Sequence, residues 1–536
     1  MTDKHVWLNH YPDDISTDVE IPNTTLPQIL QNTSEEYPQN DAILFYQQKM
    51  SYKELNMSVQ AFASSIQQSG INKGDRVAIM LPNCPQYVIS FYGVLAAGAI
   101  VTQINPMLVE RELQYILADS GAQTVVVLDM LYPRVKAIQQ NTGLKNIIVV
   151  SLQPNDQTYK PDISFYEFMK VGNGIVSPVD TDPEHDIAVL QYTGGTTGRP
   201  KGAMLTHRNL IANNVQAQEF FKNDVEKGKE RCLIVLPFFH VFGMSACMNF
   251  SIFNAASMVL LPRFDVEEVL HTIKAEKPTI FPGVPTMFIA ILNHPNATDY
   301  GIDCIKVCNS GGAPMPVEVL KAFEEKTGSK IVEGFGMSES GPVTHSNPLF
   351  AERKTGSVGI PYPSTDFKIV DIADGKLEVP AGEVGELIVS GPQIMKGYWN
   401  MTDETMHTLR DGWLYTGDIA RMDEDGYLYI VDRKKDMIIA SGFNIYPRDI
   451  EEVLYEHPSI QEAVVVGVQD AYRGETVKAF VVLKQGEQPN EQDIINYCKD
   501  HMASYKVPTI IEFKAELPKT TVGKILRRAL RENNVT

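Results

Sequence analysis

The sequence predicts an α/β fold, in which a large N-terminal domain with doubly wound, mainly parallel sheets precedes a small α+β C-terminal domain. Short apolar runs alternate with helical segments from residue 75 onward. This alternation is typical of parallel strands with helices on both faces of a sheet. The last hundred or so residues change to β-rich runs, and a chain of 536 residues exceeds one ordinary core. At least two domains are therefore expected.

The elements of the large domain follow one another at short spacing. The first strand is a buried apolar run, and the helix after it is apolar and ends near a glycine. The predicted strands are Asp75–Leu81, Ile100–Ile104, Thr124–Leu128 and Asn146–Ser151, and the predicted helices are Pro85–Gly98, Val109–Ser120 and Leu131–Gln140.

The small domain is predicted to start near Asp432, directly after the strand-like run Tyr427–Val431. This divides the chain into residues 1–431 and 432–536. Two β-rich runs follow, Ala463–Val468 and Lys478–Leu483, with a turn between them. Asn490–Met502 is predicted to be helical, with Asn490 as its N-cap.

Composition limits the partners and the compartment. The formal net charge of −19 would repel nucleic acid, so no nucleic-acid partner is expected. The six cysteines form no CxxC pair, and the N-terminus lacks the apolar core of a signal peptide, so reduced thiols in a cytoplasm are expected. Two long uncharged stretches, 77–109 and 232–262, are interrupted by Pro, Asn, Gln and His, which favours buried elements over a membrane span of about 20 apolar residues.

A loop rich in glycine and threonine gives the sharpest local signal for function. It follows the apolar run Ile187–Leu190, so it lies where α/β folds bind ligands. Its glycines allow backbone N–H groups to face an anion, while its threonines add hydroxyl donors and its lysine a charge. It is not a Walker loop, because a proline precedes the lysine and a glycine follows it. The loop reads Thr193-Gly194-Gly195-Thr196-Thr197-Gly198-Arg199-Pro200-Lys201-Gly202.

With this loop, the chain resembles the adenylate-forming superfamily, which includes acyl-CoA synthetases, adenylation domains of peptide synthetases and beetle luciferases. Further motifs of that family follow in the family's order between Tyr52 and Arg528. They are Phe239-His240-Val241-Phe242-Gly243, Ser310-Gly311-Gly312-Ala313-Pro314, Gly334-Phe335-Gly336-Met337-Ser338-Glu339, Tyr415-Thr416-Gly417-Asp418, Asp432-Arg433-Lys434-Lys435-Asp436 and Pro518-Lys519-Thr520-Thr521-Val522-Gly523-Lys524.

The resemblance implies that a carboxylate attacks the α-phosphate of ATP. Because both groups are negative, such a step needs cations and hydrogen-bond donors around the phosphorus. Thr196, Thr197 and Lys201 suit the β- and γ-phosphates, and Ser338, where the family usually has threonine, can donate to the α-phosphate. Glu339, with Thr196, suits Mg²⁺. The remaining ATP or AMP contacts are Thr193, Gly194, Gly195, Gly312, Ala313, Pro314, Gly334, Phe335, Gly336 and Met337, together with Asp418 and Arg433 at the ribose and Lys435 nearby.

The resemblance also implies a second half-reaction, in which coenzyme A takes the acyl group. Lys524 is then the lysine that bridges the attacking carboxylate and the α-phosphate, and the small domain is mobile about a hinge at Asp432. Arg263 and the loop Ser441-Gly442-Phe443 are expected to contact CoA. One departure from the family is Ile439, which stands where many relatives have lysine before this loop.

The acid is expected to be uncharged apart from its carboxylate. His240 lies in an apolar stretch that contains no carboxylate between Glu230 and Asp265, so an amino-acid substrate would leave its ammonium unpaired at a high cost. The match assigns His240 to a gate between the acyl and thiol channels.

A fatty acid–CoA ligase is predicted. The alternatives are an aryl-CoA ligase of the coumarate type, a luciferase-like oxygenase, and a non-catalytic acyl or nucleotide sensor. Weak peripheral membrane contact is expected for collecting fatty acid, and monomer and homodimer both stay open.

Overall fold

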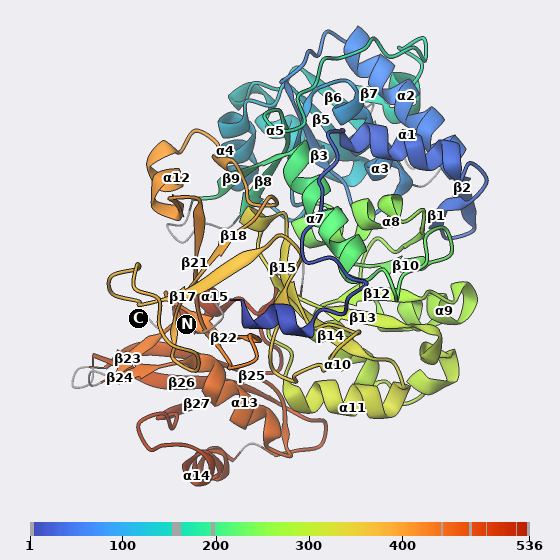
Figure 1. Cartoon of the computed structure of the whole chain (residues 1–536). Coiled ribbons are helices and arrows are strands. Elements are labelled where there is room, and N and C mark those ends of the chain that lie inside the picture. The colour runs from blue at the N-terminus through green and yellow to red at the C-terminus, as the bar shows by residue number, and fades with distance from the viewer. Residues whose placement is uncertain are drawn as a thin grey trace.

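The structure is a computed structural model of the chain, and it describes residues 5–152, 162–193, 199–440, 443–470, 474–488, 490–520 and 523–532. Two large sheets and a smaller third sheet make up the part before residue 434, and a small α+β domain lies at the lower left of Figure 1. The fold class predicted from the sequence is therefore confirmed.

The first large sheet has eight strands in the order β19-β9-β8-β4-β3-β5-β6-β7. Strands β3 to β8 pair in parallel, whereas β9 runs antiparallel to β8 and β19 antiparallel to β9. The four strands predicted between residues 75 and 151 are confirmed. The bounds are β3 (Arg76–Met80), β4 (Ile100–Gln103), β5 (Thr124–Leu128), β6 (Asn146–Val150), β7 (Ile163–Ser164), β8 (Ile187–Thr193), β9 (Lys201–Thr206) and β19 (Gly397–Tyr398).

The predicted helices of this half are also confirmed. Helix α3 (Pro85–Ala96) is buried around nearly its whole circumference, which explains why the first uncharged stretch lacks a polar face. None of the helices in the described ranges is long and apolar enough to cross a membrane. The other helices are α1 (Leu26–Glu36), α2 (Tyr52–Gln68), α4 (Glu110–Ser120), α5 (Tyr132–Ile138) and α6 (Phe165–Phe168).

The second large sheet has nine strands in the order β16-β15-β14-β13-β12-β10-β11-β1-β2, parallel from β14 to β1. A continuous core joins it to α1, α2, α3 and the first sheet. The strands are β1 (Asp41–Phe45), β2 (Gln48–Ser51), β10 (Arg231–Ile234), β11 (Ser257–Leu260), β12 (Ile280–Gly283), β13 (Val307–Ser310), β14 (Ile331–Gly336), β15 (Val343–Ser346) and β16 (Ile360–Pro361). The helices are α7 (His207–Phe220), a π-helix η4 (Phe242–Asn249), α8 (Phe250–Phe253), α9 (Val266–Glu276), α10 (Pro285–Asn293) and α11 (Val317–Thr327).

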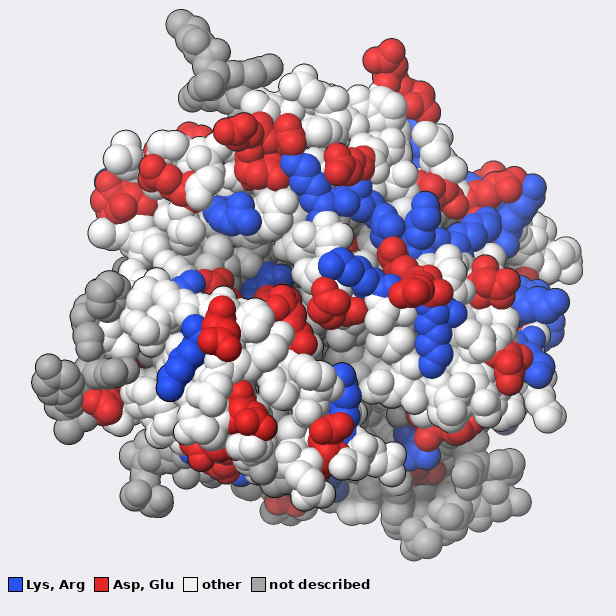
Figure 2. Space-filling view, turned by 90° about the horizontal axis from the view of Figure 1, so that it is seen from below, with Lys and Arg blue, Asp and Glu red and all other residues white. Residues whose placement is uncertain are grey.

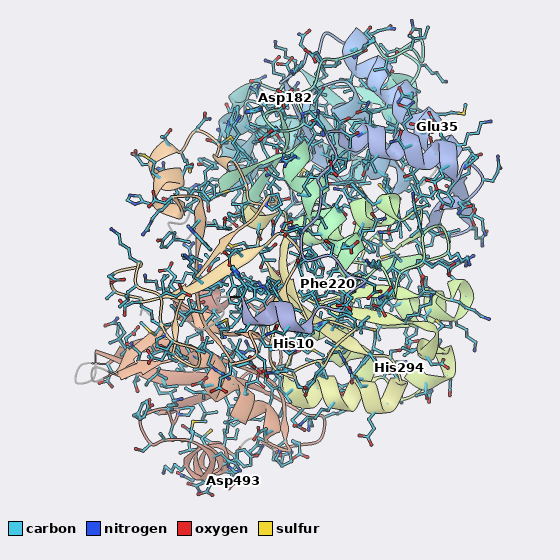
Figure 3. All side chains as sticks on the ribbon, in the orientation of Figure 1. His10, Glu35, Asp182, Phe220, His294 and Asp493 are labelled. Atoms are coloured by element: carbon cyan, nitrogen blue, oxygen red, sulfur yellow. The ribbon has the colours of Figure 1, made fainter. Side chains whose placement is uncertain are left out.

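The third sheet is antiparallel and ends the large domain. The N-terminal 3₁₀ helix η1 (Val6–His10) packs on it through Trp7, whose ring centroid lies 4.7 Å from that of Phe367. Tyr11 continues this contact to Phe220 at the end of α7, near the middle of the molecule in Figure 3. The bounds are β17 (Asp366–Val370), β18 (Gly385–Ser390), β20 (Leu409–Arg410), β21 (Trp413–Met422), β22 (Leu428–Arg433) and α12 (Thr402–Thr408).

The small domain has its own apolar core beneath a five-stranded sheet. Both predicted strands are present, and Asn490 caps α14 as expected, since its side chain accepts from the backbone N–H of Asp493. Strand β22 runs past the predicted boundary as far as Arg433. The bounds are β23 (Ile438–Ala440), β24 (Phe443–Ile445), β25 (Ile460–Asp470), β26 (Gly474–Leu483), β27 (Ile510–Phe513), α13 (Pro447–Glu456), α14 (Glu491–His501) and α15 (Arg527–Glu532).

The face drawn in Figure 2 carries charges of both signs, and the cysteines are free thiols. Acidic and basic side chains are interspersed over the face seen in Figure 2. The six cysteines all lie in the described ranges as free thiols, and each is buried except Cys304, which is half-buried.

Candidate active site

The predicted site residues Asp418, Arg433 and Lys524 meet where the third sheet faces the C-terminal loop. Asp418 on β21 lies opposite Arg433 on β22, and Arg433 Nε is 3.4 Å from Asp418 Oδ1. Both side chains act electrostatically on Lys524, as does Arg527. A carboxylate and two cations that lie far apart in the sequence are thus brought together at the boundary between the two domains.

Lys524 is held in place by a short loop of the small domain. Its backbone N–H donates to Thr520 Oγ1 at 3.1 Å, and its carbonyl accepts from the Thr520 N–H at 2.7 Å. The preceding Gly523 has φ of 74°, and a Cβ there would lie 2.6 Å from Thr286 Oγ1. A glycine is therefore required for this loop to approach α10 so closely. Burial, reinforced by Arg433, lowers the pKa of Lys524 to about 7.

Asp418 is buried, and two cationic side chains lie near its carboxyl group. Burial raises the pKa of its carboxyl, while Arg433 and Lys524 act against that rise. The Asp418 backbone N–H donates to Thr416 Oγ1 at 3.1 Å, which fixes this end of the Tyr415–Asp418 motif. A fixed carboxylate can accept hydrogen bonds from two neighbouring hydroxyl groups, as the prediction of a ribose contact requires.

The residues predicted to flank adenine lie at the carboxyl ends of β13 and β14. Gly312 has φ of 77° in the turn that leads to Ala313 and Pro314. On β14, a Cβ at Gly336 would lie only 2.2 Å from the carbonyl oxygen of Pro342. Glycine is needed there because the backbones touch. Gly334 and Phe335 complete the end of this strand, and Met337 donates its N–H to Pro342 at 3.1 Å.

Glu339 and Lys201 share a cluster of partners that the sequence did not reveal. Glu339 is buried in the turn that begins at Ser338, and its Oε1 accepts from Tyr398 Oη at 2.7 Å. Lys201 is also buried; it forms an ion pair with Glu404 of α12, and its Nζ lies 5.3 Å from the centroid of the Tyr398 ring. Tyr398 and Glu404 stand about 200 residues from Lys201 in the chain, and no local motif marks them.

Part of the predicted set lies outside the described residues. These are Gly194, Gly195, Thr196 and Thr197 of the first loop, and Ser441 and Gly442 of the second. The ends of both loops are described: Thr193 pairs with Lys201 across β8 and β9, and Phe443 begins β24 opposite Ala440.

Two further predicted cations lie at the surface. Lys435 is exposed, but its amine is partly enclosed by the protein, and this partial burial together with Arg433 lowers its pKa. Arg263 follows β11 and acts electrostatically on Tyr46. Strands β10 and β12 lie between β11 and β13, so Arg263 is at the same sheet edge as the adenine-flanking turn but well to one side of it.

His240 lies near Lys524, and Phe242, two residues further along the chain, lines an uncharged cavity. Its Nδ1 accepts from the Phe242 N–H at 3.2 Å, and burial together with Lys524 lowers its pKa to about 4, so the ring is neutral at pH 7. The cavity measures about 50 Å³, and Phe242, whose ring would contact a Cβ at Gly311, is one of the residues that line it. No charged side chain lines it. Its lining is Asn213, Asn214, Ala217, Phe221, Val225, Phe242, Ala246, Phe250, Ile280, Pro282, Val307, Asn309, Val343 and Tyr362.

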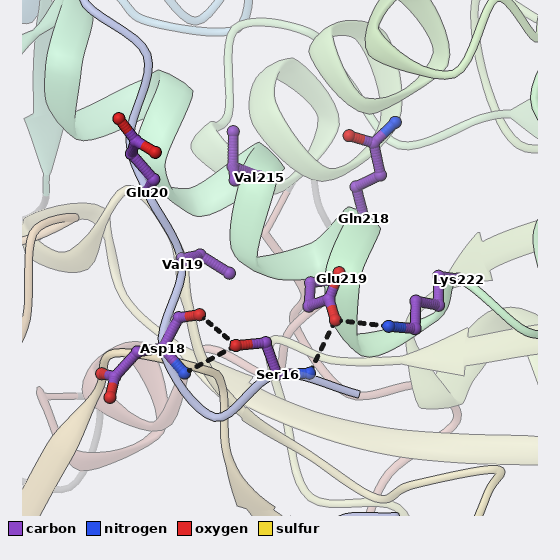
Figure 4. Close-up of a pocket in the computed structure, with 8 residues that line it drawn as sticks. All are labelled: Ser16, Asp18, Val19, Glu20, Val215, Gln218, Glu219 and Lys222. Carbon is purple, nitrogen blue, oxygen red and sulfur yellow. Dashed lines mark hydrogen bonds and ion pairs between the residues drawn. The ribbon is translucent and has the colours of Figure 1, made fainter. Parts of the chain in front are cut away.

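A second hollow lies on the outer side of α7 and has a different character. The N-terminal segment crosses α7 there, and Glu219 accepts from the Ser16 N–H at 2.7 Å and pairs with Lys222 (Figure 4). Acidic side chains such as Asp18 and Glu20 face this groove. Residues of α7 line both hollows, Val215, Gln218 and Glu219 the outer one and Asn213, Asn214 and Ala217 the inner one, so the helix separates the charged groove from the uncharged cavity.

Taken as a whole, the geometry is that of a nucleotide-binding α/β enzyme whose site is completed by a small second domain. Residues 30–399 match the family described as AMP-binding enzyme, and residues 449–524 match the AMP-binding enzyme C-terminal domain. The chain belongs to this family of adenylate-forming enzymes, as the sequence motifs predicted.

Relatives and solved structures agree with this assignment. A long-chain-fatty-acid–CoA ligase of Bacillus subtilis is 48% identical over 553 residues, which cover 99% of this chain and 98% of the relative. ATP-bound MatB from Rhodopseudomonas palustris matches with a TM-score of 0.87 and 30% identity, covering 96% of this chain and 99% of that one. An anthranilate CoA ligase in complex with anthranoyl-AMP matches with a TM-score of 0.88 and 29% identity, covering 96% and 98%.

Proposed function

We propose that this protein is an ATP-dependent fatty acid–CoA ligase, which forms acyl-AMP with release of pyrophosphate and then transfers the acyl group to coenzyme A. The observation that carries the proposal is the meeting of Lys524, Asp418 and Arg433 near His240, two residues before Phe242, which lines an uncharged cavity. The ligase name of the 48% identical relative supports the substrate class.

In the first step, a carboxylate oxygen bonds to the α-phosphorus while the bond from that phosphorus to the pyrophosphate oxygen breaks. Lys524 offsets the negative charge of both reacting groups, and it is positioned by the loop that docks on α10. Asp418 and Arg433 hold the ribose, and the Gly312 turn and Phe335 flank the base. His240 is neutral, so it adds no charge that would compete with Lys524.

The residues around Glu339 fit a magnesium ion that is shared with the phosphates. Within the described ranges no group of three or more His, Cys, Asp or Glu side chains forms a metal cage. Mg²⁺ typically binds one or two carboxylates together with phosphate oxygens, so Glu339, with the hydroxyl of Thr196, would hold it. The ion would neutralise the phosphate charge, while Tyr398 orients the Glu339 carboxylate.

In the second step, the thiol sulfur bonds to the acyl carbonyl carbon, the bond to AMP breaks, and the thiol proton leaves to water. We infer that the small domain, residues 432–536, turns about Asp432 between the two steps, so that the loop at residues 441–443 replaces Lys524 at the site. Asp432 is buried and accepts from the N–H groups of Arg433 and Arg448 at 2.7 and 3.1 Å. Asp432 also pairs with Ile419 across β22 and β21, so it contacts both domains and suits a pivot.

The test is a product assay on the purified protein. With ATP, Mg²⁺, CoA and a series of saturated fatty acids, we expect AMP, pyrophosphate and acyl-CoA in equal amounts. Coumarate in the same series separates an aryl-CoA ligase from a fatty acyl ligase. Formation of ADP and inorganic phosphate would contradict the mechanism, and the absence of any pyrophosphate would indicate a sensor.

Weak peripheral membrane contact belongs to the same proposal, because long-chain acids partition into bilayers. Co-sedimentation with anionic vesicles that contain fatty acid tests it, and gel filtration of the same sample separates a monomer from a homodimer.

A further inference from the structure

Lys201, at the end of the loop rich in glycine and threonine, already holds an anion that belongs to this chain. Its ammonium forms an ion pair with the carboxylate of Glu404; the Lys201 side chain is only 8% exposed, whereas that of Glu404 is 34% exposed. Lys201 Nζ also lies 5.3 Å from the centroid of the Tyr398 ring. An ammonium that is buried without an anion is costly, so Lys201 needs a counter-ion whenever no nucleotide is present.

The position of Glu404 relative to Lys201 is fixed by the backbone around both residues. Strand β19 pairs with β9, and Lys201 is the first residue of β9. Helix α12, which carries Glu404, is tied to β19 by the next residue, Thr405. The Thr405 Oγ1 accepts from the Tyr398 N–H at 2.8 Å and donates to the carbonyl of Met401 at 2.9 Å. The carboxylate is thus placed at the ammonium by two segments about 200 residues apart in the chain.

The ion pair lies at the end of the site where the outer phosphates of ATP are expected. Thr193, directly before the described gap in the first loop, pairs with Lys201 across β8 and β9. Tyr398, whose ring lies near the Lys201 ammonium, donates its hydroxyl to Glu339 Oε1 at 2.7 Å. Glu339 is the carboxylate proposed to hold Mg²⁺ together with these phosphates. Pyrophosphate carries more negative charge than one carboxylate, so it would compete with Glu404 for Lys201.

We propose that Glu404 is an exchangeable counter-ion, which holds Lys201 while the site is empty, yields it to the β- and γ-phosphates of ATP and takes it back as pyrophosphate leaves. Glu404 suits this exchange because its side chain is 34% exposed, so the released carboxylate can turn toward solvent. Since it competes with phosphate, Glu404 weakens the binding of pyrophosphate and favours its release. It is thus a positioning residue that acts through Lys201, and this inference rests on the function proposed above.

The first experiment measures the binding of magnesium pyrophosphate and of AMP to the full-length protein by calorimetry, without any acid. Glu404→Gln and Glu404→Ala remove the competing charge. Asp403→Asn removes the same charge from the exposed neighbour on α12 and is the matched control. We expect both Glu404 variants to bind pyrophosphate about five- to tenfold more tightly, a factor between those typical of exposed and of buried charged pairs. AMP lacks the outer phosphates, so its affinity should not change, and Asp403→Asn should match the unaltered protein for both ligands.

A second experiment tests whether the effect passes through Lys201. Magnesium pyrophosphate at a fixed, high concentration should raise the melting temperature of Glu404→Gln more than that of the unaltered protein, because tighter binding stabilises the folded state more. In a Lys201→Met background no ammonium is left to exchange. There, adding Glu404→Gln should leave the shift in melting temperature caused by pyrophosphate unchanged.

Three results would refute the exchange. The Glu404 variants could bind pyrophosphate as the unaltered protein does or more weakly, which would show that Glu404 does not compete with phosphate. Their affinity for AMP could rise by the same factor, or the change at Glu404 could act as strongly in the Lys201→Met background. If the unaltered protein releases no pyrophosphate from ATP with any acid in the product assay, the proposed function itself fails. That outcome is distinct from the other three, because the binding experiments contain no acid.

Discussion

Lys524 should give the adenylation step a pH dependence near neutrality. Burial and Arg433 lower its pKa to about 7, and a lysine carries its charge below its pKa. Lys524 is therefore protonated in about half of the unliganded protein at pH 7 and in about one tenth of it at pH 8. We expect kcat/KM for acyl-AMP formation to fall about fivefold from pH 7 to 8 and about tenfold from pH 8 to 9. The fall in kcat should come at higher pH, because bound phosphates raise the pKa of the lysine.

The assay is the initial rate of pyrophosphate release from pH 6 to 9, compared between the unaltered protein and two variants. Lys524→Arg keeps its charge throughout this range and should give a flat profile. Lys524→Ala should also be flat, at a rate about 10²–10³ lower, by comparison with deleted oxyanion donors. Ionisation of ATP is the same in all three samples. If the rate of Lys524→Ala falls with increasing pH in the same way as the rate of the unaltered protein, another group causes the fall. The assignment of Lys524 is then wrong.

Three further changes address the metal, the base and the acid. Glu339→Gln should weaken Mg²⁺-dependent adenylation while ATP still binds, because an amide is a poorer ligand than a carboxylate, and a Mg²⁺ titration of the rate measures this. Gly336→Ala should raise the KM for ATP about tenfold or more, because its Cβ would lie 2.2 Å from the Pro342 carbonyl; unchanged kinetics would place adenine elsewhere. Ala246→Phe should fill the cavity and lower kcat/KM for long fatty acids by about tenfold or more relative to short ones, and an equal loss for all chain lengths would exclude this cavity as the acyl site.

Much of the large domain could be predicted because its pattern is local. Each strand from β3 to β6 is a short apolar run, and each intervening helix is bounded by recognisable turn or cap residues. The antiparallel return of β9 on β8 and the addition of β19 from almost 200 residues away could not be predicted, because strand pairing at a sheet edge leaves no local trace in sequence.

The same distinction applies to the site. Asp418 and Arg433 were predicted as a pair from family motifs, and the structure places them opposite each other on β21 and β22. The ion pair between Lys201 and Glu404 was not predicted, since it depends on how distant segments pack. Such contacts follow from the fold as a whole rather than from any single motif.

The buried thiols make this protein well suited to fluorescence labelling. Burial raises the pKa of each cysteine, to about 12 at Cys84 and Cys232 and about 11 at Cys498. A maleimide dye reacts with an accessible thiolate, so the native thiols should react slowly while the protein is folded. A pair of cysteines introduced at the surface, one in each domain, could therefore be labelled without first removing the natural ones. Energy transfer between two such dyes would report the orientation of the small domain, one molecule at a time, as substrates are added.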